Sequence, residues 1–292
     1  MQASLFIKTD CTLGEAPMWH AERKSIWWVD INEGHFFECD IATKNIHCWK
    51  IPQQLSLLVQ AESDKSCIVI AVEDGLLKFD IEKNDFERIL YLEHDVTENR
   101  TNDGACDANG RLWLGTMHSD CKAGAGKLYC IEDNTKVQGK IEQTTISNGL
   151  CWSLQNDRMY YIDSATYKVQ SYFFDPLTAQ IIFDKTIIDI PRDFGMPDGM
   201  TIDVEGMLWI AQWGGFCVKR WNPENGELLN TIELPVPNVT SCVFGGENLD
   251  QLFITTARAG LSPEELEKYP LSGSVFVAPL KIRGVSAKKF RV

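Results

Sequence analysis

Three polar residues stand at similar places along this 292-residue chain and could together bind a metal ion. Glu15 and Asp198 carry carboxylates and Asn148 an amide oxygen, the hard ligands that Ca²⁺, Mg²⁺ or Mn²⁺ prefer and that Zn²⁺ also accepts. Two negative charges balance one divalent ion, whereas two buried carboxylates without a cation cost several kcal/mol. The set therefore predicts a metal site at which a carbonyl or phosphoryl group is polarised for attack by water.

The spacing of these residues links them to one another. Asn148 follows Asp103 by 45 residues, Asp198 follows Asn148 by 50, and Ser241 follows Asp198 by 43. Asp103 itself follows Glu15 by 88 residues. Asn-Gly and Asp-Gly pairs are also turn signals, so each residue taken alone is read more simply as part of a turn. The shared spacing favours one common site, with a purely structural ion as the alternative.

A repeat of strand-length apolar runs predicts how these residues are brought together. The runs lie at residues 25–30, 67–72, 111–116, 158–163, 207–212 and 251–256. Their leading residues are 41, 45, 47, 49 and 44 positions apart: Trp27, Ile68, Trp113, Tyr160, Trp209 and Phe253. Four strands per unit of about 45 residues are typical of a β-propeller blade, and a sandwich or β-helix does not repeat at this period.

The chain is therefore predicted to be all-β, a six-bladed β-propeller with four antiparallel strands per blade, forming a single domain over residues 1–292 with the metal in its central channel. The first strand of each blade lines the channel, which places the polar residues there. The strand near residues 4–8 is expected to pair with the last blade and close the ring. Residues 262–268 begin with a capping serine and a proline, which predicts one short helix.

Composition excludes several classes of partner. With 28 basic and 41 acidic side chains the net charge is −13, which disfavours nucleic acid and anionic membranes. No signal-peptide pattern and no apolar run of about 18 residues is present, so a soluble, cytoplasmic protein is expected. The ten cysteines form no CxxC pair and are interpreted as reduced thiols. A monomer or a weak dimer is expected.

Seven motifs closely resemble the regucalcin / gluconolactonase / luciferin-regenerating-enzyme family. They run in order from about residue 10 to 285: GEAP at 14–17, NRTNDG at 99–104, SNGL at 147–150, MYYID at 159–163, PDGM at 197–200, LWIA at 208–211 and TSCVFGG at 240–246. The resemblance implies a six-bladed propeller with one catalytic divalent metal, and it identifies Glu15, Asn148 and Asp198 as the ligands. It also implies that Arg100 and Asn102 bind the substrate.

One position departs from the animal members of this family. Their sugar-contacting glutamate falls on Asp120, a carboxylate one methylene shorter, and the loop that follows at residues 121–126 is short. We interpret Asp120 as a further substrate-binding residue and expect this change to affect which lactone is bound, with the reaction unchanged.

Together these patterns predict a metal-dependent hydrolase that opens a sugar lactone, such as gluconolactone, to the aldonic acid. The metal would polarise the lactone carbonyl, and Asp198 is the predicted proton acceptor for the attacking water. A phosphotriesterase-like hydrolase on the same site is the alternative among enzymes, because the site would polarise P=O as readily as C=O. A non-catalytic calcium-binding protein is the alternative from another class.

Overall fold

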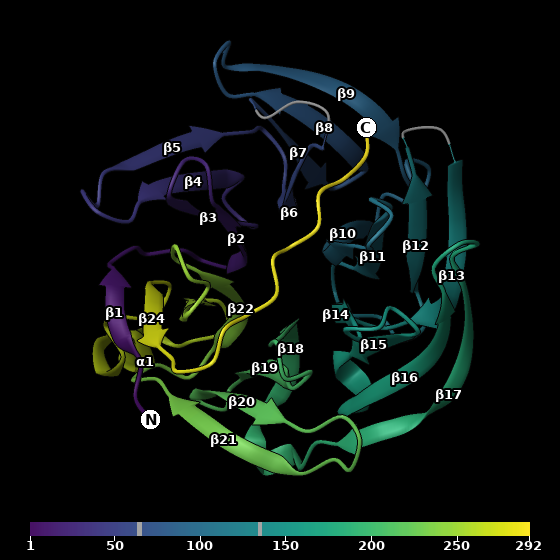
Figure 1. Ribbon diagram of the computed structural model, residues 1–292. Helices are drawn as coiled ribbons and strands as arrows, with labels where there is room; N and C mark the ends of the chain where they lie inside the picture. Colours follow the sequence, from purple (N-terminus) through teal and green to yellow (C-terminus); the bar gives the residue numbers. More distant parts are fainter. Residues whose placement is uncertain (63–65, 134–135) are drawn as a thin grey trace.

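A computed structural model describes residues 1–62, 66–133 and 136–292 of the chain, and these residues form six four-stranded antiparallel sheets. Figure 1 shows the sheets arranged as blades around a central axis, which confirms the six-bladed β-propeller predicted from the repeat. The channel in the middle is lined by the first strand of each blade. The fold therefore brings residues that are far apart in sequence to one axis.

The first three blades follow the chain without interruption. The first holds β2 (Gly14–His20), β3 (Ser25–Asp30), β4 (His35–Asp40) and β5 (Ile46–Lys50). The second holds β6 (Leu55–Gln60), β7 (Cys67–Val72), β8 (Gly75–Asp80) and β9 (Asp85–Tyr91). The third holds β10 (Asn99–Cys106), β11 (Leu112–His118), β12 (Gly126–Glu132) and β13 (Lys136–Thr144).

The last three blades continue the order, and the final one borrows a strand. The fourth holds β14 (Ser147–Trp152), β15 (Arg158–Asp163), β16 (Lys168–Asp175) and β17 (Gln180–Asp189). The fifth holds β18 (Met196–Ile202), β19 (Leu208–Trp213), β20 (Cys217–Trp221) and β21 (Leu228–Glu233). The sixth holds β22 (Val239–Gly245), β23 (Gln251–Thr256), β24 (Val275–Pro279) and β1 (Ser4–Ile7). The predicted ring closure is thus confirmed, with Ser4 opposite Val277.

Buried tryptophans in the second strands hold the blades together. Trp113 and Trp209 are fully buried, and each indole N–H donates to an aspartate in the preceding turn: Asp107 at 3.0 Å and Asp203 at 2.9 Å. Each aspartate also accepts backbone N–H groups of its own turn. Because buried indoles and carboxylates both need partners, this arrangement fixes the turn between the first and second strand while packing the blade.

Every inner strand carries a register shift at corresponding places. The shifts lie between Glu15 and Met18, Leu55 and Leu57, Thr101 and Gly104, Ser147 and Leu150, Pro197 and Met200, and Val239 and Ser241. A β-bulge of this kind leaves a residue outside the regular pairing and turns its side chain in a new direction. The bulges coincide with the polar motifs that the sequence analysis singled out.

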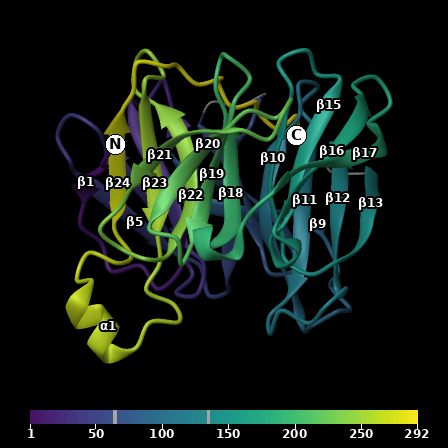
Figure 2. The ribbon, with the colours of Figure 1, turned by 90° about the horizontal axis from the view of Figure 1, so that it is seen from below.

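The two ends of the ring differ. The predicted helix is α1 (Pro263–Lys268), capped by Ser262 through a reciprocal capping box with Glu265. It lies between β23 and β24, at the end where the inner strands begin, and Figure 2 shows it on the far side from the C-terminal segment. In the described ranges no helix has the length and apolar character needed to cross a membrane.

The C-terminal segment, residues 283–291, crosses the other end of the channel and is called the C-terminal strap below (Figure 1, yellow). Its two ends are tied to different blades. At one end the N–H of Val204 donates to the carbonyl of Arg283 at 3.0 Å. At the other, the N–H of Phe290 donates to the carbonyl of Gln60 at 2.8 Å, and the Phe290 side chain is fully buried.

Candidate active site in the channel

Two of the three predicted metal ligands are in direct contact. The Nδ2 of Asn148, in the β14 bulge, donates to Oδ1 of Asp198 in the β18 bulge and also to Oγ of Ser164 at 3.1 Å. Asn148 is 5% and Asp198 7% exposed, so the contact is almost removed from solvent. Among the described residues no hydrogen bond is donated to Oδ1 of Asn148, which leaves that oxygen available to a ligand.

A glycine makes this contact possible. A Cβ built on Gly149 would lie 2.6 Å from the carbonyl oxygen of Asp198, closer than real Cβ atoms come to other atoms. Only glycine allows the first strands of the fourth and fifth blades to approach this closely. The Asn148-Gly149 pair therefore serves to bring two strands together, in addition to carrying a polar side chain.

Glu15 lies directly before the β2 bulge on the same channel and still pairs with Val29. Its Oε2 accepts a hydrogen bond from the N–H of Ala16 at 3.0 Å. Ala16 has a φ of 46°, an uncommon backbone conformation for a residue other than glycine. The bulge thus begins with an uncommon backbone conformation at Ala16, whose N–H fixes one oxygen of the Glu15 carboxylate.

The carboxylates influence each other electrostatically. Burial raises the pKa of Glu15 well above its ordinary value, and the charges of Asp198 and Asp103 raise it further. Burial also raises the pKa of Asp198, as does the charge of Asp103, against the opposing hydrogen bond from Asn148. Like charges in a poorly solvated channel favour the protonated forms, and a cation between them reverses this preference.

Two further aspartates fix the backbone just ahead of β2 and β14, the strands that carry Glu15 and Asn148. Asp163, the last residue of β15, accepts the N–H groups of Thr145 and Ile146, both at 2.9 Å, just before β14 begins. Asp30, the last residue of β3, does the same for Thr12 and Leu13 ahead of β2. These carboxylates hold the backbone at the positions from which Asn148 and Glu15 project.

Arg100 and Asn102 form a second polar group on β10. Nη1 of Arg100 donates to Oδ1 of Asn102 at 2.7 Å and to the carbonyl of Thr101 at 2.9 Å. Nδ2 of Asn102 donates to the carbonyl of Ser147 at 2.9 Å, which ties the third blade to the fourth beside Asn148. The charges of Glu15 and Asp198 raise the pKa of Arg100, but burial has the larger effect and lowers it.

Asp120 is not part of this cluster. It lies in the exposed turn after β11, where its N–H donates to Nδ1 of His118 at 3.0 Å. The described residues show no hydrogen bond or ion pair between its side chain and Arg100 or Asn102. The turn nevertheless lies near the site, because the neighbouring Cys121 acts electrostatically on Arg100.

Three residues outside the predicted set also contribute to the site: Ser164, Asp30 and Asp163. Ser164 opens a 3-10 helix, Ser164–Thr166, and meets the amide of Asn148, but a lone serine after a strand carries no signal. The clamps Asp30 and Asp163 could have been found, because WWVD at 27–30 and YYID at 160–163 are corresponding strand ends in different blades. Comparing the repeats for such shared aspartates would have identified them.

The donor set fits a divalent cation. Glu15, Asp198 and Oδ1 of Asn148 are hard oxygens of the kind Ca²⁺ and Mg²⁺ take, and the mutual repulsion of the carboxylates is relieved by a positive charge. Over residues 1–62, 66–133 and 136–292, no three His, Cys, Asp or Glu side chains gather as a metal cluster. The candidate set therefore depends on an amide as its third ligand.

Comparison with known proteins places the chain in a family. Residues 13–258 match the family described as SMP-30/Gluconolactonase/LRE-like region. The chain belongs to this family. It is 34% identical over 284 residues to the regucalcin of Oryctolagus cuniculus, covering 96% of this chain and 93% of that protein. It is 33% identical over 293 residues to a Bacillus subtilis (strain 168) protein named "Putative sugar lactone lactonase YvrE", covering 99% of each.

A solved structure supports the same grouping. The regucalcin of Agrobacterium tumefaciens, described as a calcium-binding protein, has a TM-score of 0.95 and 27% identity, covering 99% of this chain and 97% of that one. The resemblance predicted from the seven motifs is thus confirmed. Membership in a gluconolactonase-like family points to a lactonase, and the calcium-binding relative points to a divalent metal.

Proposed function

We propose that this member of the gluconolactonase-like family hydrolyses a sugar lactone to the aldonic acid with a divalent metal held by Glu15, Asn148 and Asp198. The observation that carries the proposal is the buried carboxylate of Asp198, with the amide of Asn148 in contact with it and the partly buried carboxylate of Glu15 close enough for the two negative charges to repel each other. A metal bound there would act as a Lewis acid on the lactone carbonyl and stabilise the developing oxyanion.

Arg100 and Asn102 have different roles in binding the sugar: Arg100 contacts it, and Asn102 positions Arg100. Asn102 uses one acceptor and one donor position to hold Arg100 and the carbonyl of Ser147, so its main effect is to fix the guanidinium. Arg100 retains N–H groups beyond Nη1 that donate to hydroxyl or carbonyl oxygens of the substrate. Neither group is a base, because a guanidinium stays protonated and an amide does not titrate.

Asp198 is the residue we assign to proton transfer. Its carboxylate is buried in the channel at the candidate metal site, where it would lie next to a water that the metal activates. It accepts the proton of the attacking water as the carbonyl carbon is attacked and returns this proton to the ring oxygen as the ring C–O bond breaks, which releases the hydroxy acid. Asp120, on the exposed turn after β11, is proposed to contact the sugar only when the lactone is bound.

The proposal is tested by a panel of aldonolactones followed by a pH indicator. Chelator-treated protein is assayed alone and with Ca²⁺, Mg²⁺, Mn²⁺ or Zn²⁺, and Asp198→Asn is compared with Asp189→Asn, an exposed carboxylate at the end of β17. We expect metal-dependent hydrolysis that falls at least about 100-fold in Asp198→Asn and is unchanged in Asp189→Asn.

Three results would contradict the proposal in different ways. Full activity of Asp198→Asn would remove that residue from the mechanism. Hydrolysis of phosphotriesters but of no lactone would change the substrate class. Tight metal binding without hydrolysis of either class would make the protein a metal-binding protein only.

A further inference from the structure

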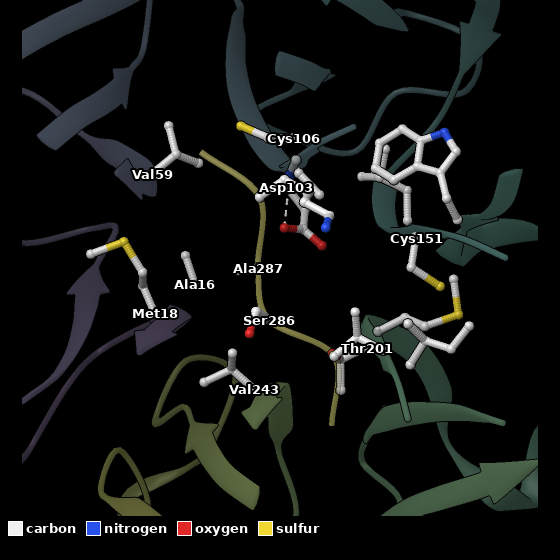
Figure 3. A pocket seen from close by; sticks show the side chains of 18 of the residues that line it. Ala16, Met18, Val59, Asp103, Cys106, Cys151, Thr201, Val243, Ser286 and Ala287 are labelled. Carbon is white, nitrogen blue, oxygen red and sulfur yellow. Dashed lines mark hydrogen bonds between the residues drawn. The ribbon is translucent and has the colours of Figure 1, made fainter. Parts of the chain in front are cut away.

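A partly open cavity of about 240 Å³ lies in the channel beyond the candidate active site. Its walls come from the parts of the inner strands that follow the polar bulges, together with the C-terminal strap. The side chains that give it an apolar character are Ala16, Met18, Leu57, Val59, Cys106, Leu150, Cys151, Met200, Ile202 and Val243. Figure 3 shows several of them surrounding the space. None of Glu15, Asn148 and Asp198 lines it.

The C-terminal strap forms the outer wall of this cavity. Residues 285–288 line it, and the strap is tied down on both sides, at Arg283 and at Phe290. Between these ties, Ser286, Ala287 and Lys288 are exposed, and among the described residues they make no backbone hydrogen bond. A small molecule can therefore enter past the middle of the strap while its ends stay attached.

Asp103 is the one acidic side chain that lines the cavity. Figure 3 shows its carboxylate pointing into the space next to Ser286 and Ala287. Oδ1 accepts a hydrogen bond from the N–H of Gly104 at 2.7 Å, and within the described parts of the chain the side chain has no ion pair. Lys288 also lines the cavity, but from the exposed strap. The carboxylate therefore has acceptor capacity left over in apolar surroundings.

The bulge in β10 separates Asp103 from the candidate active site. Asn102 directs its side chain to Arg100 and the carbonyl of Ser147, whereas the next residue, Asp103, lines the cavity. Both residues lie in the register shift between Thr101 and Gly104, and a bulge changes the direction of the side chains within it, so consecutive residues line different spaces. The cavity thus has its own charged group, which lines a different space from Glu15 and Asp198 although its charge still acts on both of them.

We propose that this cavity is a second ligand site, which binds a small molecule with an apolar body and a primary ammonium group paired with Asp103. An unpaired carboxylate in apolar surroundings is costly, and a cationic donor relieves that cost better than a neutral one. Cavities of about 150 Å³ accept benzene, so this one has room for a single ring with a short amine-bearing side chain. Mostly apolar walls with one well-placed polar group are typical of small-molecule sites.

Benzylamine and its neutral counterpart benzyl alcohol are the probes for this site. Binding is measured on Ca²⁺-saturated protein, so that Glu15 and Asp198 are not available to the amine. The methyl groups of methionines report the location by carbon-13 NMR, because Met18 and Met200 line the cavity while the fully buried Met159 does not. We expect shifts at Met18 and Met200, none at Met159, and at least tenfold weaker binding of benzyl alcohol.

Two variants separate charge from volume. Asp103→Asn keeps the shape and is expected to reduce benzylamine affinity to that of the alcohol. Val59→Phe fills the space and is expected to weaken both probes. Benzyl alcohol binding as tightly as benzylamine, equal affinity in Asp103→Asn, shifts confined to other methionines, or no binding would each overturn the proposal. None of these results depends on lactone hydrolysis, so the two proposals fail separately.

Discussion

Replacing Asp103 by asparagine is expected to stabilise the folded protein at neutral and alkaline pH. Burial raises the pKa of Asp103 from its ordinary 3.8 to about 6, and the hydrogen bond from Gly104 opposes this only in part. Between those pH values the folded protein keeps a proton that the unfolded chain has released. The wild type therefore loses stability as the pH rises from about 4 to about 6 and stays at the lower level above that range. Asparagine does not titrate, so the Asp103→Asn variant does not lose this stability as the pH rises.

The size of this effect follows from the two pKa values. A change from 3.8 to about 6 corresponds to about 3 kcal/mol, because each pKa unit is worth about 1.4 kcal/mol. Because Asp103 is only partly buried, solvent screens part of its charge, and about 2–3 kcal/mol is expected at pH 8. With an unfolding entropy of about 0.6 kcal/mol/K for a chain of this length, the Tm should rise by about 3–5 °C.

Thermal unfolding followed by tryptophan fluorescence at about pH 4 and pH 8 tests this reasoning. Asp85→Asn is the matched control, because Asp85 also accepts the N–H of the next residue, at 2.9 Å, but on the exposed start of β9. We expect the Asp103→Asn gain at pH 8 to shrink toward zero at pH 4 and the control to show no such change. A destabilised Asp103→Asn at pH 8, or a gain that is the same at both pH values, would refute the argument.

Two further predictions concern the candidate metal site. Calcium binding to chelator-treated protein, measured by calorimetry, should weaken as the pH falls from about 8 to about 5. Burial and the charges of neighbouring carboxylates raise the pKa values of Glu15 and Asp198, so protons compete with the metal in this range. An affinity that is independent of pH would contradict this. Asp163→Asn loses one of two acceptors for the backbone ahead of β14 and should weaken metal binding about tenfold, although Asp163 is not a ligand. Unchanged metal affinity in that variant would show that the clamp does not position Asn148.

The blade count and ring closure could be predicted because each blade repeats the same physical problem. Each sheet that packs against the previous sheet needs a buried second strand. That strand carries a large aromatic or branched residue, such as Trp113 or Trp209. The period of the pattern then gives the architecture. The strand Ser4–Ile7 was predictable for the same reason, since a sixth blade otherwise ends on an unpaired edge.

The candidate site was predictable only in part. Spacing along the chain shows which residues occupy equivalent positions in different blades, but only to within one residue. The count from Asp103 to Asn148 suggested that these two are equivalent. The observed register places Asn102 directly after the break at Thr101, as Asn148 follows Ser147 and Asp198 follows Pro197. A one-residue difference directs a side chain to the other side of the strand, which is why Asp103 serves the cavity instead.

The C-terminal strap and its cavity could not be read from the sequence. Residues 283–291 have no strand periodicity, and their position is set by backbone hydrogen bonds to the turns of other blades, as at Gln60 and Val204. Such contacts depend on where the ring has already placed its turns. Only Phe290 hints at burial, and a single aromatic residue near a terminus does not say where it is buried.

Because all six inner strands share a bulge, the side chains at the candidate site are separate from the hydrophobic residues that hold each blade together. Three of the six bulges contain Asn102, Asn148 and Asp198 of the candidate site, and Glu15 directly precedes a fourth. Ser56 and Thr240 occupy the other two and bond to neighbouring blades, at Thr101 and at the carbonyl of Gly14. Each bulge is a small variable position set in a blade whose hydrophobic core does not depend on it. Duplicated blades could therefore diverge one residue at a time, and new reactions could evolve around the same axis without rebuilding the ring.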